Sequence, residues 1–211
     1  MLRVGLTGGI ACGKTVVAEM MREFGCVILN ADRMAHRLIE PGGAAFESVV
    51  REFGRGILDG EGHIVRTKLA EIVFADPPRL AKLSAIIHPY VLSQLDAELA
   101  RLEESDFRGV AVVEAALLVE SGYCHRLDRL VLVWCTPEQQ LERLIDRRGG
   151  RGMSETQARQ RIASQTSLEE KRKLADDEID CSGTLADTRR QVATLVERLT
   201  LLAATTASKR F

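Results

Sequence analysis

Arg3-Val4-Gly5-Leu6-Thr7-Gly8-Gly9-Ile10-Ala11-Cys12-Gly13-Lys14-Thr15 is the stretch of sequence that decides the fold. Its first part, Arg3 to Thr7, is largely apolar and runs into two glycines, a pattern typical of a buried strand that enters a tight loop. Residues 8–15 fit the spacing G-x-x-x-x-G-K-[ST] in full. The stretch therefore predicts a phosphate-binding loop between a strand and a helix.

The residue types of this loop suit the binding of a polyphosphate. Glycines permit a backbone in which successive N–H groups point at the phosphates, and the following helix adds the positive end of its dipole. We expect Lys14 to contact the β- and γ-phosphates and the Thr15 hydroxyl to bind Mg²⁺. The residues expected to bind ATP are Gly8, Gly9, Ile10, Ala11, Cys12, Gly13, Lys14, Thr15 and Val16.

Cys12 stands at a variable position of the motif and has two interpretations. A thiol at a helix N-terminus can have a lowered pKa and oxidise readily. Alternatively, Cys12 is a small residue that only fills space.

The residues around the loop indicate the fold class. Val17, Met20, Met21 and Phe24 recur at helical spacing until Gly25, and an apolar strand follows at residues 26–29. Strand, helix and strand in this order indicate a parallel pair with a right-handed crossover. Further apolar runs at 110–113 and 130–133 predict strands buried on both faces, with a weak strand at 178–180. We expect an α/β fold, a three-layer parallel sheet flanked by helices, as in P-loop NTPases.

The region between residues 31 and 105 has a different pattern. Short helical segments alternate with Pro- and Gly-rich punctuation, and no strand is convincing. The last of these helices is expected to begin at His88-Pro89. We predict a single domain over 1–211, with a core at about 1–34, 109–141 and 166–203, a helical insertion at about 35–108 and a lid at about 142–165.

Composition excludes several classes of protein. Of 211 residues, 45% are hydrophobic and 28% charged, and the net charge of −1 provides no global field for nucleic acid or a membrane surface. No apolar run approaches the roughly 18 residues of a membrane span. The 5 cysteines form no CxxC pair, and the 4 histidines have no metal-binding spacing. We expect a reduced, soluble, cytoplasmic protein without nucleic acid, membrane or obligatory protein partner.

Two acidic residues follow predicted strands. Asp32 lies where a carboxylate can deprotonate an attacking hydroxyl, since the carboxyl ends of parallel strands face the ligand; it also suits the N-cap of a helix over 33–38. Glu114 can hold Mg²⁺ through water, or it can be a solvated strand end. Sequence alone leaves both choices open.

The segment from Glu142 to Arg161 is rich in arginine and contains six arginines but only three acidic residues. A mobile lid of this charge would cover the transferring phosphoryl group and exclude water. A solvated helical hairpin is the alternative. The phosphate-binding loop favours the lid.

A series of further motifs, in order along the chain, resembles the dephospho-CoA kinase family. They are Thr7 to Thr15, Ala31-Asp32-Arg33-Met34-Ala35-His36, Pro41-Gly42, Ile72-Val73-Phe74, His88-Pro89, Leu117-Leu118-Val119-Glu120, Arg161-Ile162 with Gln165, and Ala175-Asp176 with Ile179-Asp180. The resemblance implies an ATP-dependent phosphotransferase that phosphorylates the ribose 3′-hydroxyl of dephospho-CoA, giving CoA and ADP in the last step of coenzyme A synthesis.

The same resemblance implies roles for individual residues. Asp32 would be the base, the helical insertion would bind the acceptor, and Arg147 would be a lid arginine that contacts phosphate. Residues implied at the acceptor are Asp32, His88, Leu117, Leu118 and Glu120. Four positions depart from the family's usual residues, namely Cys12, Asn30, Ala116 and Cys181. None of the four removes Lys14, Thr15 or Asp32.

Two other functions are compatible with a phosphate-binding loop. One is a P-loop kinase for a nucleotide, sugar or hydroxy acid. The other is a nucleotide-dependent switch, because Asp59-Gly60-Glu61-Gly62 fits the DxxG pattern of GTP switches. No N-K-x-D motif for guanine follows, and the neighbouring glycines suit a plain loop.

Overall fold

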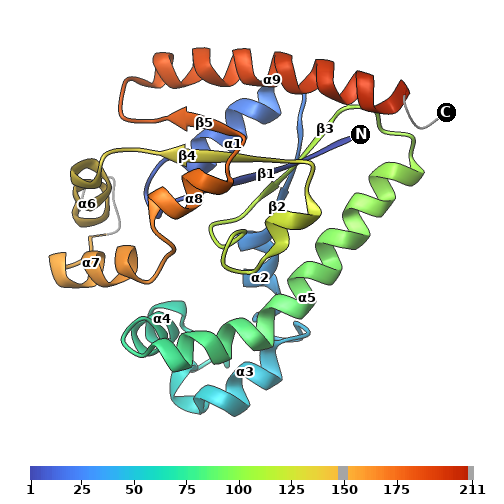
Figure 1. The fold of residues 1–211 in the computed structure, drawn as a ribbon. Helices are drawn as coiled ribbons and strands as arrows, with labels where there is room; N and C mark the ends of the chain where they lie inside the picture. The colour runs from blue at the N-terminus through green and yellow to red at the C-terminus, as the bar shows by residue number, and fades with distance from the viewer. Residues whose placement is uncertain (147–151, 209–211) are drawn as a thin grey trace. The chain divides into compact units, whose positions relative to one another are not determined.

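A parallel β-sheet forms the centre of the fold in the computed structural model, which describes residues 1–146 and 152–208 (Figure 1). Within these residues the strands are β1 Leu2–Gly8, β2 Val27–Asn30, β3 Val110–Glu114, β4 Arg129–Trp134 and β5 Asp177–Asp180. Their order is β2-β3-β1-β4-β5, and every neighbouring pair is parallel. The predicted α/β class with a parallel sheet is confirmed.

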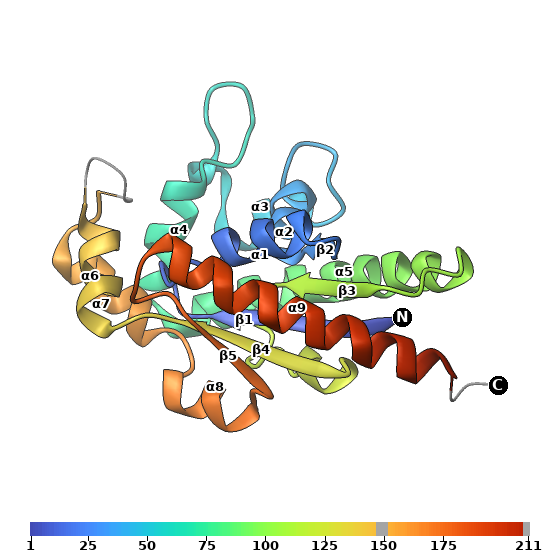
Figure 2. The same cartoon turned by 90° about the horizontal axis from the view of Figure 1, so that it is seen from above.

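Helices cover both faces of this sheet. α1 (Lys14–Glu23) and α9 (Leu185–Ser208) lie side by side on one face, and α8 (Leu168–Leu174) contacts β4 from the other (Figures 1 and 2). Alternate strand residues such as Val4, Val112 and Val131 pack with Met21 of α1 and Leu199 of α9 in one core. All five residues of β3 are buried, as expected of a strand covered on both faces.

Three helices near the carboxyl edge of the sheet begin at capping boxes. These helices are α6 (Pro137–Ile145), α7 (Glu155–Ala163) and α8. Thr136, Ser154 and Ser167 each accept a hydrogen bond from a backbone amide three residues on, and the side chain at that position bonds back. Such caps satisfy amides that a helix start leaves without partners. Local sequence therefore determines where these helices begin.

The chain divides into two compact units, residues 1–30 with 98–211, and residues 31–97. The first unit holds the sheet and also η2 (Tyr123–Arg126). The second contains α2 (Ala31–Leu38), α3 (Phe46–Phe53), η1 (Arg55–Ile57), α4 (Arg66–Phe74) and most of α5 (Pro77–Glu104). Residues 31–97, all of them described, contain no strand, only an isolated bridge between Leu58 and Ile64.

The expected helix start at His88-Pro89 is wrong. α5 begins at Pro77, and Pro89 lies inside it. Proline fits the first turn of a helix, where its missing N–H is not needed, and this favours the start at Pro77. An interior proline removes one helical hydrogen bond, but the flanking Ile87 and Val91 are both buried, and their packing keeps the helix continuous.

The helices and the cysteines each have one further property. Among the helices of the described residues, none is long and apolar enough to cross a membrane. All the cysteines, Cys12, Cys26, Cys124, Cys135 and Cys181, are buried free thiols.

Candidate active site

The phosphate-binding loop leaves β1 at Gly8 and enters α1 at Lys14. A Cβ at Gly8 would lie 2.4 Å from the carbonyl oxygen of Val133, so only glycine allows β1 to approach β4 this closely. Gly13 caps α1 with φ of 95°, a conformation that L side chains rarely adopt. No acidic residue stands in the first turn of α1. Its positive end is therefore available for an anion.

Glu114, at the end of β3, organises the polar side chains beside this loop. Its carboxylate is 2% exposed, accepts from Lys14 Nζ at 3.1 Å and Thr15 Oγ1 at 3.0 Å, and also accepts from the amide of Asn30. The strand register explains this meeting, because Glu114 pairs with Leu6 of β1 and with Asn30 of β2. The alternative of a solvated strand end is therefore wrong for Glu114.

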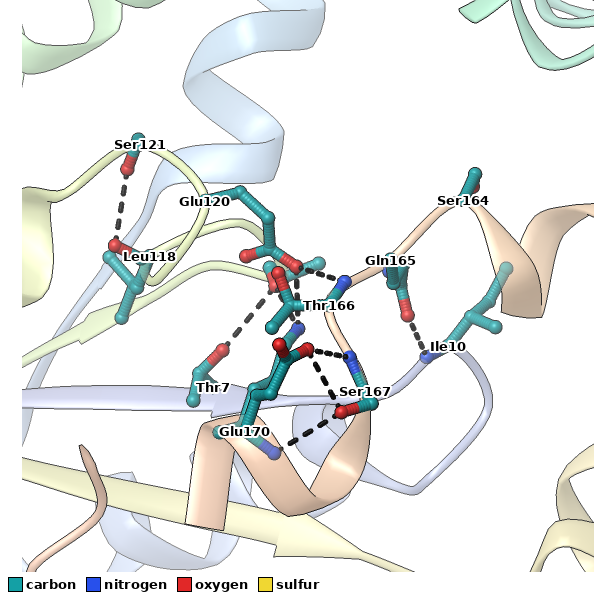
Figure 3. A network of polar contacts seen from close by, with 12 residues as sticks. Thr7, Ile10, Leu118, Glu120, Ser121, Ser164, Gln165, Thr166, Ser167 and Glu170 are labelled. Carbon is teal, nitrogen blue, oxygen red and sulfur yellow. Dashed lines mark hydrogen bonds and ion pairs between the residues drawn. The ribbon is translucent and has the colours of Figure 1, made fainter. Parts of the chain in front are cut away.

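Three side chains hold the tip of the loop from outside. Gln165 Oε1 accepts from the Ile10 amide at 2.9 Å, and Gln140 Nε2 donates to the Ile10 carbonyl at 2.7 Å (Figure 3 shows Gln165). The Arg143 guanidinium donates to the carbonyl oxygens of Ala11 at 3.3 Å and Cys181 at 2.9 Å. The sequence does not reveal these contacts with the loop, because the partners lie more than a hundred residues away and leave no local pattern.

An ion pair between a buried lysine and Glu120 lies next to the segment 164–167. Lys171 is 1% exposed, its Nζ lies 3.0 Å from Glu120 Oε1, and it donates to the Ala116 carbonyl at 3.0 Å. Glu120 also accepts from the Thr166 amide at 3.0 Å, and Thr7 Oγ1 donates to Ala116 O at 3.3 Å (Figure 3). This network connects α8 to the segment after β3 and to β1.

The remaining predicted acceptor residues lie in different parts of the chain. Asp32 is in the first turn of α2, which begins at Ala31, so the N-cap interpretation for a helix over 33–38 is wrong. Asp32 and His88 belong to the second unit. His88 has a lowered pKa because burial disfavours its charged form. Leu118 is buried and Leu117 is partly exposed, while Arg147 lies outside the described residues.

The DxxG segment forms a local turn. The Asp59 carboxylate accepts from the amides of Glu61 at 3.0 Å and His63 at 2.8 Å. These bonds close the connection between Leu58 and Ile64. They favour a plain loop over a nucleotide switch.

Cys12 is the titratable group of the loop whose ionisation its surroundings change most clearly. The pKa of its thiol is lowered to about 7, chiefly because the Cys135 thiol donates a hydrogen bond to it, with help from backbone groups and the Arg143 charge. Burial opposes this effect. The lowered pKa agrees with the first interpretation of Cys12, and its burial agrees with the second.

The central strand of this parallel sheet leads through a G-x-x-x-x-G-K-T loop into a helix, and a strand-end carboxylate lies beside the lysine. This combination defines a nucleotide phosphotransferase of the P-loop kinase class. Comparisons with known proteins narrow this class. The family model for dephospho-CoA kinase matches residues 2–187. The chain therefore belongs to the dephospho-CoA kinase family.

Individual relatives agree with this assignment. The dephospho-CoA kinase of Aquifex aeolicus is 42% identical over 200 residues, 95% of this chain and 98% of that protein. That of Geobacillus kaustophilus is 41% identical over 197 residues, with coverage of 93% and 96%. Among solved structures, TT1252 from Thermus thermophilus aligns with TM-score 0.74 and 33% identity over 94% of this chain and 98% of that one. The dephospho-CoA kinase from Campylobacter jejuni aligns with TM-score 0.61 and 25% identity, covering 94% and 97%.

Proposed function

We propose that this protein transfers the γ-phosphoryl group of ATP to the ribose 3′-hydroxyl of dephospho-CoA, giving CoA and ADP, the last step of coenzyme A synthesis. The observation that carries the proposal is the Lys14–Thr15–Glu114 cluster beside a phosphate-binding loop, in a chain of this family. Phosphoryl transfer requires mainly positioning and charge stabilisation, and such a cluster supplies both.

In this proposal the loop binds the triphosphate before any bond changes. The amides of the loop and of the first turn of α1 donate to phosphate oxygens, and Lys14 contacts the β- and γ-phosphates. Glu114 keeps the Lys14 ammonium and the Thr15 hydroxyl in place, so little side-chain entropy is lost on binding. Gln140, Arg143 and Gln165 support the loop tip.

The residues present also fit a divalent cation such as Mg²⁺. Thr15 and Glu114 offer the hard oxygen ligands that this ion prefers, and the described residues contain no cluster of three or more His, Cys, Asp or Glu that could hold a metal alone. Thr15 would hold the ion directly and Glu114 through water, with nucleotide phosphates completing the shell. Bound there, the ion would neutralise charge on the transferring phosphoryl group.

Asp32 is the proposed general base. It accepts the proton of the ribose hydroxyl as that oxygen bonds to the γ-phosphorus, while the bond to the β–γ bridging oxygen breaks and ADP leaves. We propose that the acceptor is bound by His88, Leu117, Leu118 and Glu120 and by the helical insertion at about 35–108. Arg147 and its lid are proposed to neutralise phosphate charge and exclude water. We infer that the protein acts in the cytoplasm, where its free thiols stay reduced.

The acceptor is tested by measuring ADP release with dephospho-CoA and with a panel of nucleosides, sugars and hydroxy acids. Dephospho-CoA is expected to give the highest kcat/KM. Faster turnover of another hydroxyl compound would favour a different P-loop kinase. Preferential binding of guanine over adenine nucleotides, without turnover, would favour the switch.

The base is tested by Asp32→Asn, which keeps the size of the side chain and removes its proton affinity. We expect kcat to fall by about 10²- to 10⁴-fold while ATP affinity stays nearly unchanged. Asp76→Asn, at a half-exposed residue of the same unit, is the matched control. Normal turnover by Asp32→Asn would remove Asp32 from the mechanism.

A further inference from the structure

Two glutamines hold the same residue of the phosphate-binding loop from outside the loop. Gln140, on α6, donates from Nε2 to the Ile10 carbonyl at 2.7 Å. Gln165, which follows α7, accepts from the Ile10 amide at 2.9 Å through Oε1 (Figure 3). Both glutamines are half-buried. The two backbone groups of Ile10 are thus fixed by one donor and one acceptor.

Ile10 is the second residue of a β-turn in the loop. The Cys12 amide donates to the Gly9 carbonyl at 3.3 Å, which closes the turn over residues 9–12. The third residue, Ala11, has φ of 60°, whereas Ile10 is not among the described residues with positive φ. This combination is typical of a type II turn, which favours glycine at its third position. Ala11 therefore holds a conformation that is unfavourable for a residue with a side chain.

The two glutamines face the two peptide groups that shape this turn. In a planar trans peptide the C=O and N–H groups point in opposite directions. Because the Ile10 carbonyl is directed at Gln140, the Ala11 amide of the same peptide is directed away from α6. A type I turn has this central peptide reversed, and it would return Ala11 to a negative φ. Gln140 therefore opposes the reversal, while Gln165 fixes the preceding peptide.

Gly9 gives independent support for the role of Gln140. Position 9 is variable in the phosphate-loop motif, so the motif itself does not require a glycine there. A Cβ at Gly9 would lie 2.7 Å from Gln140 Nε2 and 3.0 Å from Cys12 Sγ. A larger residue would displace the amide group of Gln140 from the Ile10 carbonyl. The glycine thus leaves room for this hydrogen bond.

Both glutamines belong to segments that are themselves anchored. α6 begins at a capping box, which fixes its first turn. The residue after Gln165 is Thr166, whose amide donates to the Glu120 carboxylate at 3.0 Å (Figure 3). Glu120 in turn lies 3.0 Å from the ammonium of the buried Lys171. Each glutamine therefore holds the loop from a fixed support.

We propose that Gln140 and Gln165 are positioning residues for ATP, which keep the turn at residues 9–12 in its type II form so that the Ala11 amide faces the phosphates. Neither glutamine has to touch the nucleotide. Gln140 acts only as a donor and Gln165 only as an acceptor. The inference rests on the proposed function in one respect, namely that ATP is the ligand of the loop.

Methionine at either position tests the effect on ATP, because it keeps the length of the side chain and removes its polar group. By calorimetry with MgATP we expect Gln140→Met and Gln165→Met to bind about three- to tenfold more weakly. The KM for ATP should rise by the same factor, and the KM for dephospho-CoA should not change.

Gln191→Met is the matched control for these two variants. Gln191 accepts from the Asp180 amide at 3.0 Å and donates to the Asp180 carbonyl at 2.9 Å, so it holds a backbone in the same manner at the end of β5. This variant should lose stability in urea and keep its affinity for ATP.

Glutamate variants test the direction of each hydrogen bond. An ionised carboxylate accepts hydrogen bonds and donates none. Gln165→Glu therefore keeps the bond to the Ile10 amide, whereas Gln140→Glu loses the bond to the Ile10 carbonyl. Both variants add one negative charge beside Ile10, so repulsion of the phosphates is common to them. We expect Gln140→Glu to bind ATP at least about fivefold more weakly than Gln165→Glu.

Ala11→Gly tests the turn itself. Glycine adopts a positive φ without strain, so a type II turn with glycine at position 11 no longer needs Gln140 to hold it. In the Gln140→Met background, adding Ala11→Gly should bring the affinity for ATP back to within about twofold of the unmodified protein.

The proposal is overturned if the methionine variants bind ATP as the unmodified protein does, or if Gln191→Met weakens ATP binding as much as they do. Equal affinities of the two glutamate variants, or no recovery with Ala11→Gly, would overturn it as well. An unmodified protein that binds no ATP would end both this inference and the proposed function. One that binds ATP and transfers nothing to dephospho-CoA would end only the proposed function.

Discussion

Glu114 is the residue on which the geometry of the loop depends most. It is buried, and a buried carboxylate is stable only when donors satisfy it. Lys14, Thr15 and Asn30 are those donors. The Asn30 amide donates to Glu114, whereas an aspartate at position 30 would place a second carboxylate there and repel it. The departure at position 30 therefore has a local electrostatic explanation.

Lys14→Ala tests whether the ammonium group of Lys14 binds the phosphates. We expect turnover to fall by at least about 10²-fold, because the phosphates lose a pre-positioned cation. The fold should persist, since Thr15 and Asn30 still donate to Glu114. Steady-state kinetics and circular dichroism check both expectations, with Lys173→Ala, at an exposed residue, as the control. Normal kinetics in Lys14→Ala would show that its ammonium does not bind phosphate.

The acidity of Cys12 predicts how its alkylation depends on pH. A thiol reacts with iodoacetamide as the thiolate, and the thiolate is the form above the pKa. With a pKa of about 7, the rate at Cys12 should rise from pH 5.5 to 7.5 and level off above about pH 8. Cys26, with a pKa raised to about 11, should still be rising at pH 9. Peptide mass spectrometry reports each rate, and a Cys12 rate that keeps climbing beyond pH 8 would contradict the lowered pKa.

The sequence predicts the phosphate-binding loop but not the side-chain contacts around it. The motif placed Lys14 and Thr15 correctly in a strand–loop–helix context because motif and context are both local. It could not choose between two environments for Glu114, since the choice depends on which strands are neighbours. The supports from Gln140, Arg143 and Gln165 come from α6 and the segment after α7. Contacts over such separations have no signature in a single sequence.

At the scale of elements, α8 is anchored by its buried lysine. Lys171 reaches from the helix to Glu120 and the Ala116 carbonyl, on the segment that follows β3. Ala116 is one of the four positions that depart from the residues expected from the resemblance. Its carbonyl accepts from both Lys171 and Thr7, so the backbone here is held by hydrogen bonds.

Lys171→Met should reduce the free energy of unfolding by about 1–2 kcal/mol, because it removes the cation beside the Glu120 carboxylate and a hydrogen-bond donor to the Ala116 carbonyl. Adding Glu120→Gln should recover part of the loss, since the unpaired charge is then gone. Urea unfolding of the single and double variants gives the coupling energy. Strictly additive effects would mean that the ion pair contributes nothing. The KM for dephospho-CoA in Glu120→Gln alone separates this structural role from acceptor binding.

The start of α5 shows why one element was wrongly predicted. His88-Pro89 looks like a helix start because proline favours the first turn and disfavours the helix interior. The same rule applies at Pro77, where the helix does begin. Between these candidates the decision lies with packing, as Ile87 before Pro89 and Val91 after it are both buried. Capping signals, by contrast, are local, and they do mark the starts of α6, α7 and α8.

At the scale of the whole molecule, nucleotide binding should be visible as stability. A ligand at 100 times its dissociation constant adds about 2.7 kcal/mol to the folded state. For a chain of this size, MgATP should then raise Tm by roughly 5–10 °C. Scanning fluorimetry measures the shift, which Lys14→Ala should largely abolish. An equal shift in that variant would place the nucleotide elsewhere.

The parallel sheet could be predicted from the sequence because several apolar runs each indicate a buried strand. Apolar runs, a helix between the first two of them, and the right-handed crossover rule leave few arrangements. Strand order was not predicted, because nothing in a run of valines identifies its neighbour. The structure places β1 in the middle of the sheet, between β3 and β4.

That central position has a dynamic consequence. Backbone groups of β1 bond to a neighbouring strand on either side, so the segment cannot peel away as an edge strand can. The loop therefore starts from a strand that is held on both sides. A strand that is hydrogen-bonded along both edges passes little backbone motion to the loop at its end. The amides that bind an incoming anion are therefore expected to stay in position before the anion arrives.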